Sequence, residues 1–137
     1  MKSDITKETE TVITASNQEV PYTIHYEAEI DEYIGEAVVT IVDELPYKID
    51  KEKSDLDGGE YNEELQTITW KEEIEHINTD ETEEPYKVDI TKNIVLVYKD
   101  LDATESMVTN KVKGTVELYE TEEKNTVETE EDVLVEI

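Results

Sequence analysis

The sequence predicts an all-β domain, an antiparallel β-sandwich of roughly seven to nine strands. Three observations predict it: apolar residues recur with a period of two, turn residues separate these runs at short intervals, and helix signals are weak. The chain has 137 residues, which fits one domain with its own core. We place this domain at residues 1–119, and we expect residues 120–137 to be an acidic loop and a final strand, closing the domain or leading to a next repeat.

The first half of the chain contains three predicted strands. Ile5–Ala15 is rich in threonine and is the first of them. In Val20–Ile30, apolar and polar residues alternate, which is typical of a half-buried strand with one wet face. Ala37–Val42 is β-branched and nearly continuous, which favours a central strand.

The second half continues the same pattern. Its predicted strands are Leu65–Trp70, Lys87–Lys99, Met107–Tyr119 and Val133–Ile137. Between them, Asp57-Gly58-Gly59 is a strong turn signal. We expect Trp70–Ile77 to form a turn or two of helix, with Ile74 and Ile77 facing inward. Glu120–Asp132 is a low-complexity stretch of glutamate and threonine, which we interpret as a loop or a linker.

Charge excludes several classes of function. The chain carries 38 acidic residues against 12 lysines and no arginine, for a net charge of −26. Such a surface repels nucleic acids and anionic membranes, and it attracts cations. There is no cysteine, so the chain has neither disulfides nor thiolate metal sites. No apolar run is long enough to span a membrane, and the first residues do not resemble a signal peptide. If the parent protein is secreted, we expect this chain to be an internal piece.

Five short motifs follow one another in an order that resembles a known family. They are Ile5-Thr6-Lys7, Pro21–Tyr26, Asp43-Glu44-Leu45-Pro46, Thr69-Trp70 and Thr109–Val112. Together they resemble the DUF11-type repeats, Ig-like domains often found in tandem in bacterial cell-surface proteins. The resemblance implies an Ig-like sandwich in an extracellular, cell wall-anchored parent protein. There it would act as a spacer or presenter, with neighbouring repeats of the same chain as its partners.

The layout is also similar to that of collagen-adhesin-type domains, which form an intramolecular isopeptide bond between a lysine and an asparagine. Lys7, Asp43 and Asn110 stand in the corresponding places as the lysine, the acid and the asparagine. The reaction needs a neutral lysine and a protonated acid that polarises the amide, and burial favours both neutral forms. It also needs the three groups to be held in contact. The bond would give a covalent cross-link to a domain that has no cysteine for a disulfide.

Plainer interpretations of these residues stay open. Lys7 fits a solvated lysine on an edge strand, Asp43 fits a turn cap, and Asn110 fits a partner of neighbouring backbone. If Asp43 is not the acid, the other candidates are Glu27, Glu29 and Glu117.

Calcium is the second candidate chemistry. Asp55, Asp57, Asp100 and Asp102 lie in two acidic loops, and calcium binds six to eight oxygen ligands. The EF-hand spacing is absent, and diffuse screening of the acidic surface by cations is the alternative.

We expect no conventional enzyme activity, only autocatalytic closure of the isopeptide bond. His25 and His76 are the only histidines, and both are predicted at the surface. The sequence contains no nucleophile elbow or phosphate-binding loop. Trp70 is predicted to lie in the core of the sandwich.

Three functions remain: a monomeric structural stalk, an adhesin that binds a host matrix protein or carbohydrate, and a calcium-stabilised domain. An adhesin needs exposed aromatic residues, for which the candidates are Tyr33, Tyr47 and Tyr86. The stalk is the function that we favour for this domain.

Overall fold

The computed structural model describes residues 1–13, 17–79, 84–101, 107–119 and 123–134. The regular elements in these ranges are the strands β1 (Lys2–Glu8), β2 (Glu19–Ile30), β3 (Ile34–Glu44), β4 (Glu60–Asn62), β5 (Thr67–Asn78), β6 (Tyr86–Val97), β7 (Met107–Leu118) and β8 (Lys124–Leu134). The predicted all-β class is therefore confirmed.

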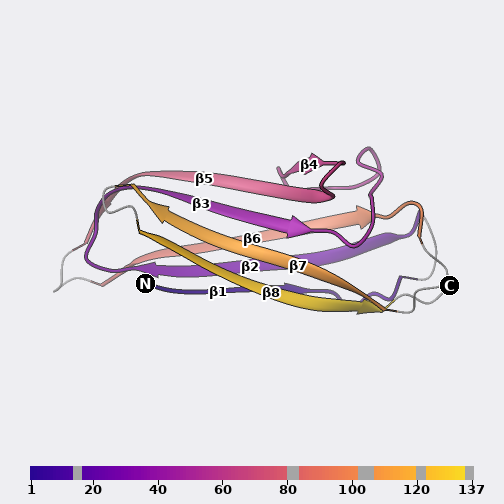
Figure 1. Cartoon of the computed structure of the whole chain (residues 1–137), viewed down its shortest axis with the longest axis horizontal. Helices are drawn as coiled ribbons and strands as arrows, with labels where there is room; N and C mark the ends of the chain where they lie inside the picture. Colours follow the sequence, from indigo (N-terminus) through magenta and orange to yellow (C-terminus); the bar gives the residue numbers. More distant parts are fainter. Residues whose placement is uncertain (14–16, 80–83, 102–106, 120–122, 135–137) are drawn as a thin grey trace.

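The strands form two antiparallel sheets. One sheet has the order β1-β2-β6, and the other has the order β4-β5-β3-β7-β8. Figure 1 shows the sheets as two layers whose strands run along the long axis of the molecule. The start of β1 and the end of β8 lie at opposite ends of this axis. The architecture is an open, sandwich-like arrangement of antiparallel sheets, as the alternating pattern predicts.

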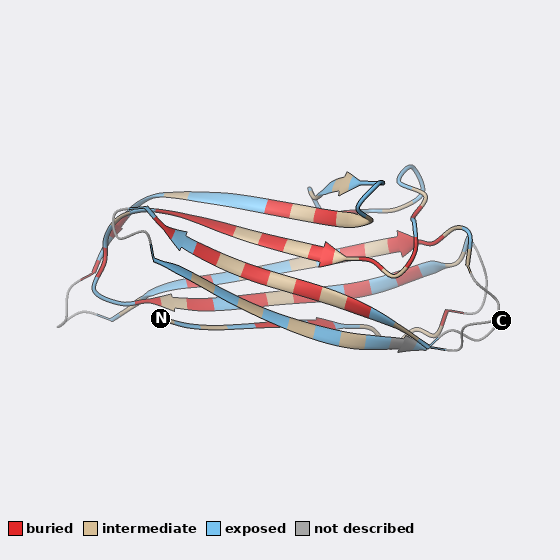
Figure 2. Ribbon diagram, viewed as in Figure 1, coloured by how far each residue is buried: buried red, intermediate tan, exposed pale blue. Residues whose placement is uncertain are grey.

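The core lies between the two layers. Along β2, every second side chain from Val20 to Ile30 is buried, and the alternation of buried and exposed residues is visible on most strands in Figure 2. Trp70 is buried, as predicted, and its indole N–H donates to the carbonyl oxygen of Leu56 at 2.9 Å. The alternation of apolar and polar residues along the strands thus gives each sheet one apolar face, which packs into the core.

One side of the sandwich is closed by contact between β1 and β8. The hydroxyl of Ser3 donates to the side-chain oxygen of Asn125, and the Asn125 amide donates to the carbonyl oxygen of Met1 at 3.4 Å. The two sheets therefore meet along this edge through side chains. This contact brings the last strand of the chain beside the first.

The prediction of a short helix at Trp70–Ile77 is wrong. The segment belongs to β5, and the pairing of β5 with β3 shifts between Gly35 and Ala37. Gly35 pairs with Ile77, whereas Ala37 pairs with Ile74, so β5 carries one extra residue there. A β-bulge of this kind moves the inward side chains from even to odd positions. The spacing of three between the two isoleucines, which resembles a helix, is produced by the bulge.

The ends of the chain also differ from the sequence-based expectation. β8 begins at Lys124 and pairs with β7 along its length, so most of the predicted acidic loop at 120–132 is strand. The predicted final strand, Val133–Ile137, is described only as far as Leu134. β1 ends at Glu8, well before the end of the predicted Ile5–Ala15 strand, whose last two residues lie outside the described part.

Candidate functional site

Lys7 is buried in the space between the two sheets. On β1 the side chains of Ile5 and Lys7 face inward, and their neighbours along the strand are mostly exposed. Only 4% of Lys7 is accessible to solvent. Lysine is almost never buried to this extent unless it is paired. The position therefore requires partners for the amine.

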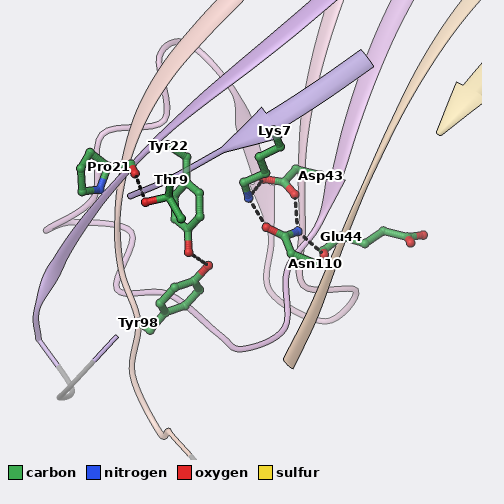
Figure 3. A network of polar contacts seen from close by, with 8 residues as sticks. All are labelled: Lys7, Thr9, Pro21, Tyr22, Asp43, Glu44, Tyr98 and Asn110. Carbon is green, nitrogen blue, oxygen red and sulfur yellow. Dashed lines mark hydrogen bonds and ion pairs between the residues drawn. The ribbon is translucent and has the colours of Figure 1, made fainter. Parts of the chain in front are cut away.

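Those partners come from the opposite sheet. The Lys7 Nζ atom donates to Asp43 Oδ2 at 2.6 Å and to Asn110 Oδ1. The Asn110 amide nitrogen donates to Asp43 Oδ1 at 2.7 Å and to the carbonyl oxygen of Glu44 at 2.8 Å. Figure 3 shows the three side chains converging from three different strands, Lys7 from β1, Asp43 from β3 and Asn110 from β7. Every polar group of the cluster is thus hydrogen-bonded within it.

Neighbouring strands position the acid and the amide. Asp43 lies on β3 directly opposite Val112 of β7, and Asn110 lies two residues before Val112 on that strand. Because side chains alternate along a strand, Asp43, Asn110 and Val112 all face the core. Asp43 is fully buried and Asn110 is 1% exposed. The pairing of β3 with β7 therefore places the acid and the amide side by side, and the lysine contacts them from the other sheet.

Burial controls the charge of the amine. It lowers the pKa of Lys7 below its usual range, and the charge of Asp43 opposes this shift. The Nζ atom also lies 4.2 Å from the centre of the Tyr22 ring. The Tyr22 hydroxyl in turn lies 3.0 Å from the hydroxyl of Tyr98. Burial thus favours the neutral, nucleophilic form of the amine, while Asp43 and the face of the Tyr22 ring favour its charged form.

The arrangement suits amide exchange between Lys7 and Asn110. The Asp43 carboxylate contacts both nitrogens of the reaction, the attacking amine and the amide nitrogen that would leave. A group in that place can take a proton from the first nitrogen and deliver it to the second. The expected role of the acid was to polarise the amide in its protonated form, whereas in the structure both Asp43 oxygens accept hydrogen bonds, one from the amine and one from the amide nitrogen.

The structure brings together all three residues that the sequence proposes for the cross-link. The alternative acids lie elsewhere: Glu27 and Glu117 are exposed and Glu29 is half-buried. Tyr22, whose ring lies beside the amine, was recognised in the sequence only as an inward strand residue. Its contact with Lys7 depends on the strand register, which sequence spacing alone does not give.

The residues proposed for calcium do not converge in the described part of the chain. Asp55 Oδ1 accepts the backbone N–H of Asp57 at 3.0 Å, and Asp57 Oδ2 accepts that of Asn93 at 2.9 Å. Asp100 has a left-handed backbone, with φ of 56°, and Asp102 lies outside the described residues. Asp55 therefore orders its own loop, and Asp57 fixes that loop to β6.

Among the described residues, one group of histidine and acidic side chains has converging ligand atoms. It consists of His25, Glu27 and Asp89 on the outer face of the three-stranded sheet. His25 Nε2 lies 2.7 Å from Asp89 Oδ1 and 3.4 Å from Glu27 Oε1. These contacts pair the imidazole with neighbouring carboxylates; the two acids are exposed and His25 is half-buried.

The aromatic residues proposed for an adhesive surface are mostly buried, so that part of the prediction is wrong. Tyr33 is 3% exposed and Tyr47 is 8% exposed, and both belong to the core. The Tyr33 hydroxyl donates to the carbonyl oxygen of Glu36 at 2.6 Å. Tyr86 alone of the three reaches the surface, with 36% exposed. A position near a loop in the sequence therefore did not indicate exposure of the side chain.

No family model and no curated protein matches this chain. Within the described residues, no helix has the length and apolarity needed to cross a membrane. The comparisons therefore add no functional residue. Among the described residues, the cluster of Lys7, Asp43 and Asn110 is the best candidate for a functional site, because a buried amine, acid and amide are in contact there.

Proposed function

We propose that this domain is a structural spacer of a bacterial cell-surface or secreted protein, closed by an autocatalytic isopeptide bond between Lys7 and Asn110. The observation that carries this proposal is the buried contact of the lysine amine with both Asp43 and the Asn110 amide. The resemblance to DUF11-type and collagen-adhesin-type domains supports the surface location. The domain would perform no other catalysis.

The energetic cost of the cluster also supports a reaction. A buried ion pair is often no more stabilising than well-packed apolar residues in its place. Here a lysine, an acid and an amide are buried beside a core that consists mostly of aliphatic and tyrosine side chains. Conversion of the amine and the amide into one neutral amide would remove the buried cation.

The position of the bond fits a domain that carries load. Lys7 and Asn110 are 103 positions apart, so the bond would close most of the chain into a loop. It would join β1 of one sheet to β7 of the other. The start of β1 and the end of β8 lie at opposite ends of the long axis. Tension applied along that axis would therefore load the bond before the chain between Lys7 and Asn110 could extend.

The test is the intact mass of the purified, folded chain. The bond forms with loss of one ammonia, so the measured mass should fall below the sequence mass by that amount. Digestion should then yield one branched peptide containing Lys7 and Asn110. The variants N110A and K7R should each have the full mass of their own sequences.

The two variants separate the bond from other losses of ammonia. An asparagine can also lose ammonia by closing on its own backbone, and that product would persist in K7R. A guanidinium keeps the positive charge beside Asp43 but does not form the amide. A folded wild-type chain with the full sequence mass would overturn the proposed cross-link.

A further inference from the structure

Glu131, on the last strand, is a second carboxylate beside the cluster of Lys7, Asp43 and Asn110. β8 pairs with β7 in a register that sets Glu131 directly opposite Asn110. Along β8 the half-buried positions alternate with exposed ones, and Glu131 belongs to the half-buried set. Directly opposed residues of an antiparallel pair have Cβ atoms about 4.5–5.5 Å apart. The carboxylate therefore extends from the same face of the same sheet as the Asn110 amide.

Hydrogen bonding satisfies only part of the Glu131 carboxylate. Its Oε2 atom is buried and has no hydrogen-bond partner among the described residues. The backbone N–H of Thr9 donates to the carboxylate. Burying an unsatisfied carboxylate oxygen destabilises a fold. Such unpaired buried groups in native structures often have a functional explanation.

The charges around Glu131 link it to the reaction. The charges of Lys7 and Glu8 on β1 both act on the carboxyl of Glu131, and the Lys7 amine in turn contacts Asp43 of β3 and the Tyr22 ring of β2. Burial raises the pKa of Glu131, and the charge of Lys7 opposes this shift. The amine and the Glu131 carboxylate thus interact electrostatically without a hydrogen bond between them. Catalytic hydrogen bonds are often long or incomplete before the reacting complex forms.

We propose that Glu131 accepts the proton that Lys7 must lose before its amine attacks Asn110. This inference rests on the proposed cross-link and assigns a residue to one of its steps. Two protons leave Nζ when an ammonium becomes an amide N–H, and the site offers two acids. Glu131 takes the first proton, which makes the amine neutral. Its partial exposure then connects the buried site to solvent.

Asp43 carries the second proton. The Nζ lone pair forms the bond to Cγ of Asn110, and Asp43 takes a proton from Nζ and passes it to the amide nitrogen. The bond from Cγ to that nitrogen then breaks with its electron pair, and neutral ammonia leaves. Asp43 ends in its starting state, and Glu131 holds the proton released at the start. Lys7 and Asn110 are joined by one amide, so atoms and charges balance.

The test compares E131Q with E130Q. Glu130 precedes Glu131 on β8 and is exposed, so E130Q removes the same charge without altering the site. Each full-length chain is made by cell-free synthesis and diluted at once into buffers from about pH 5 to about pH 9. Loss of ammonia is followed over time by intact mass. Circular dichroism of each sample checks that the chain is folded.

We expect wild type and E130Q to close the bond at the same rate. E131Q should close it roughly 10²-fold more slowly near neutral pH, the lower end of what a positioned proton acceptor contributes. The rate of E131Q should also rise with pH across the range, because only solvent is left to remove the proton. E131D, which keeps the carboxylate, should recover part of the rate.

The outcomes are distinguishable. If the wild-type chain never loses ammonia, the proposed cross-link is overturned, and so is the role of Glu131 as a proton acceptor. If wild type closes and E131Q closes equally fast at every pH, the cross-link stands and the role of Glu131 is overturned. A slow E131Q with the pH dependence of wild type would also overturn it, since that result assigns Glu131 to packing alone.

Discussion

The Lys7 amine and the Asn110 amide are in hydrogen-bond contact although 103 positions separate them. They belong to different sheets, with Lys7 on an edge strand and Asn110 on an inner strand of the larger sheet. No backbone hydrogen bonds of a β-ladder join these strands, so side chains alone link the sheets at this point. A covalent bond here would change how the sandwich unfolds.

The bond should contribute strongly to stability. In the chain-entropy treatment of cross-links, closing a loop of about 100 residues contributes roughly 4–5 kcal/mol to the free energy of unfolding. We expect N110A and K7R each to lose about that much in urea denaturation. The two variants disturb different contacts, so a common loss would belong to the shared bond. Losses that differ by several kcal/mol would instead assign the effect to the individual contacts.

The bond should also limit extension under force. When the chain is pulled from both ends, residues between Lys7 and Asn110 are shielded by the cross-link. We expect N110A to release roughly 350 Å more contour length than wild type, from about 100 residues at 3.3–3.6 Å each. Single-molecule force spectroscopy on the domain between inert handles measures this difference. Equal extensions for the two proteins would show that load does not pass through the bond.

Without the bond, the buried lysine should make stability depend on pH. Burial lowers the pKa of Lys7 in the folded state, so between that pKa and the unfolded value of 10.5 the unfolded chain binds more protons. Stability of N110A should therefore rise with pH in this window. The reference is the variant K7M/D43L/N110A, in which apolar residues replace the buried pair, and its curve should rise less. Parallel curves for the two variants would mean that Lys7 keeps its proton on folding.

The sequence predicted most of the strands well because strand formation depends on local patterns of alternation. Period-two alternation placed the strand of Val20–Ile30 almost as observed. Lys7, Asp43 and Asn110 were found through motif order, which follows strand order. The helix predicted around Ile74 failed because a bulge altered the spacing, and a bulge depends on the partner strand.

β8 was harder to predict for a different reason. Its inward residues include Asn125, Thr129 and Glu131, so the strand has little apolar alternation. The segment therefore has the composition of a loop, and its strand structure comes from pairing with β7. Glu131 was missed as a consequence. With 38 acidic residues in the chain, one carboxylate is identifiable only when the register sets it opposite Asn110.

Alkaline pH should destabilise the fold through the buried tyrosines. Burial raises the pKa of Tyr98 well above 10, and that of Tyr22 also rises. The folded state then holds these protons more tightly than the unfolded state. The contribution of these tyrosines to stability is therefore fully present below pH 10, and it falls as the pH rises beyond that value. We expect Y98F to lose about 0.5–1.5 kcal/mol at neutral pH with its hydrogen bond, and to decline less steeply in alkali. Y119F, at an exposed tyrosine, should keep the wild-type slope in the same denaturation series.

Gly114 should tolerate no side chain, because the ring of Tyr26 fills the space above it. A Cβ atom at Gly114 would lie 2.9 Å from Cζ of Tyr26 and closer still to two other ring atoms. Tyr26 is fully buried, so the ring has little room to move. We expect G114A to cost about 1–3 kcal/mol, as overpacking of a core does. Urea denaturation in the N110A background measures this without the cross-link.

A second substitution identifies the cause of that loss. In the double variant G114A/Y26L, the smaller leucine leaves room for the new methyl group. The double variant should therefore be more stable than the sum of the two single losses predicts, by a coupling of about 0.5–3 kcal/mol. Additive losses would mean that the alanine acts on the β7 backbone instead. Coupling of this size would establish that Gly114 is small because β7, the strand that also carries Asn110, must approach β2 closely across the core.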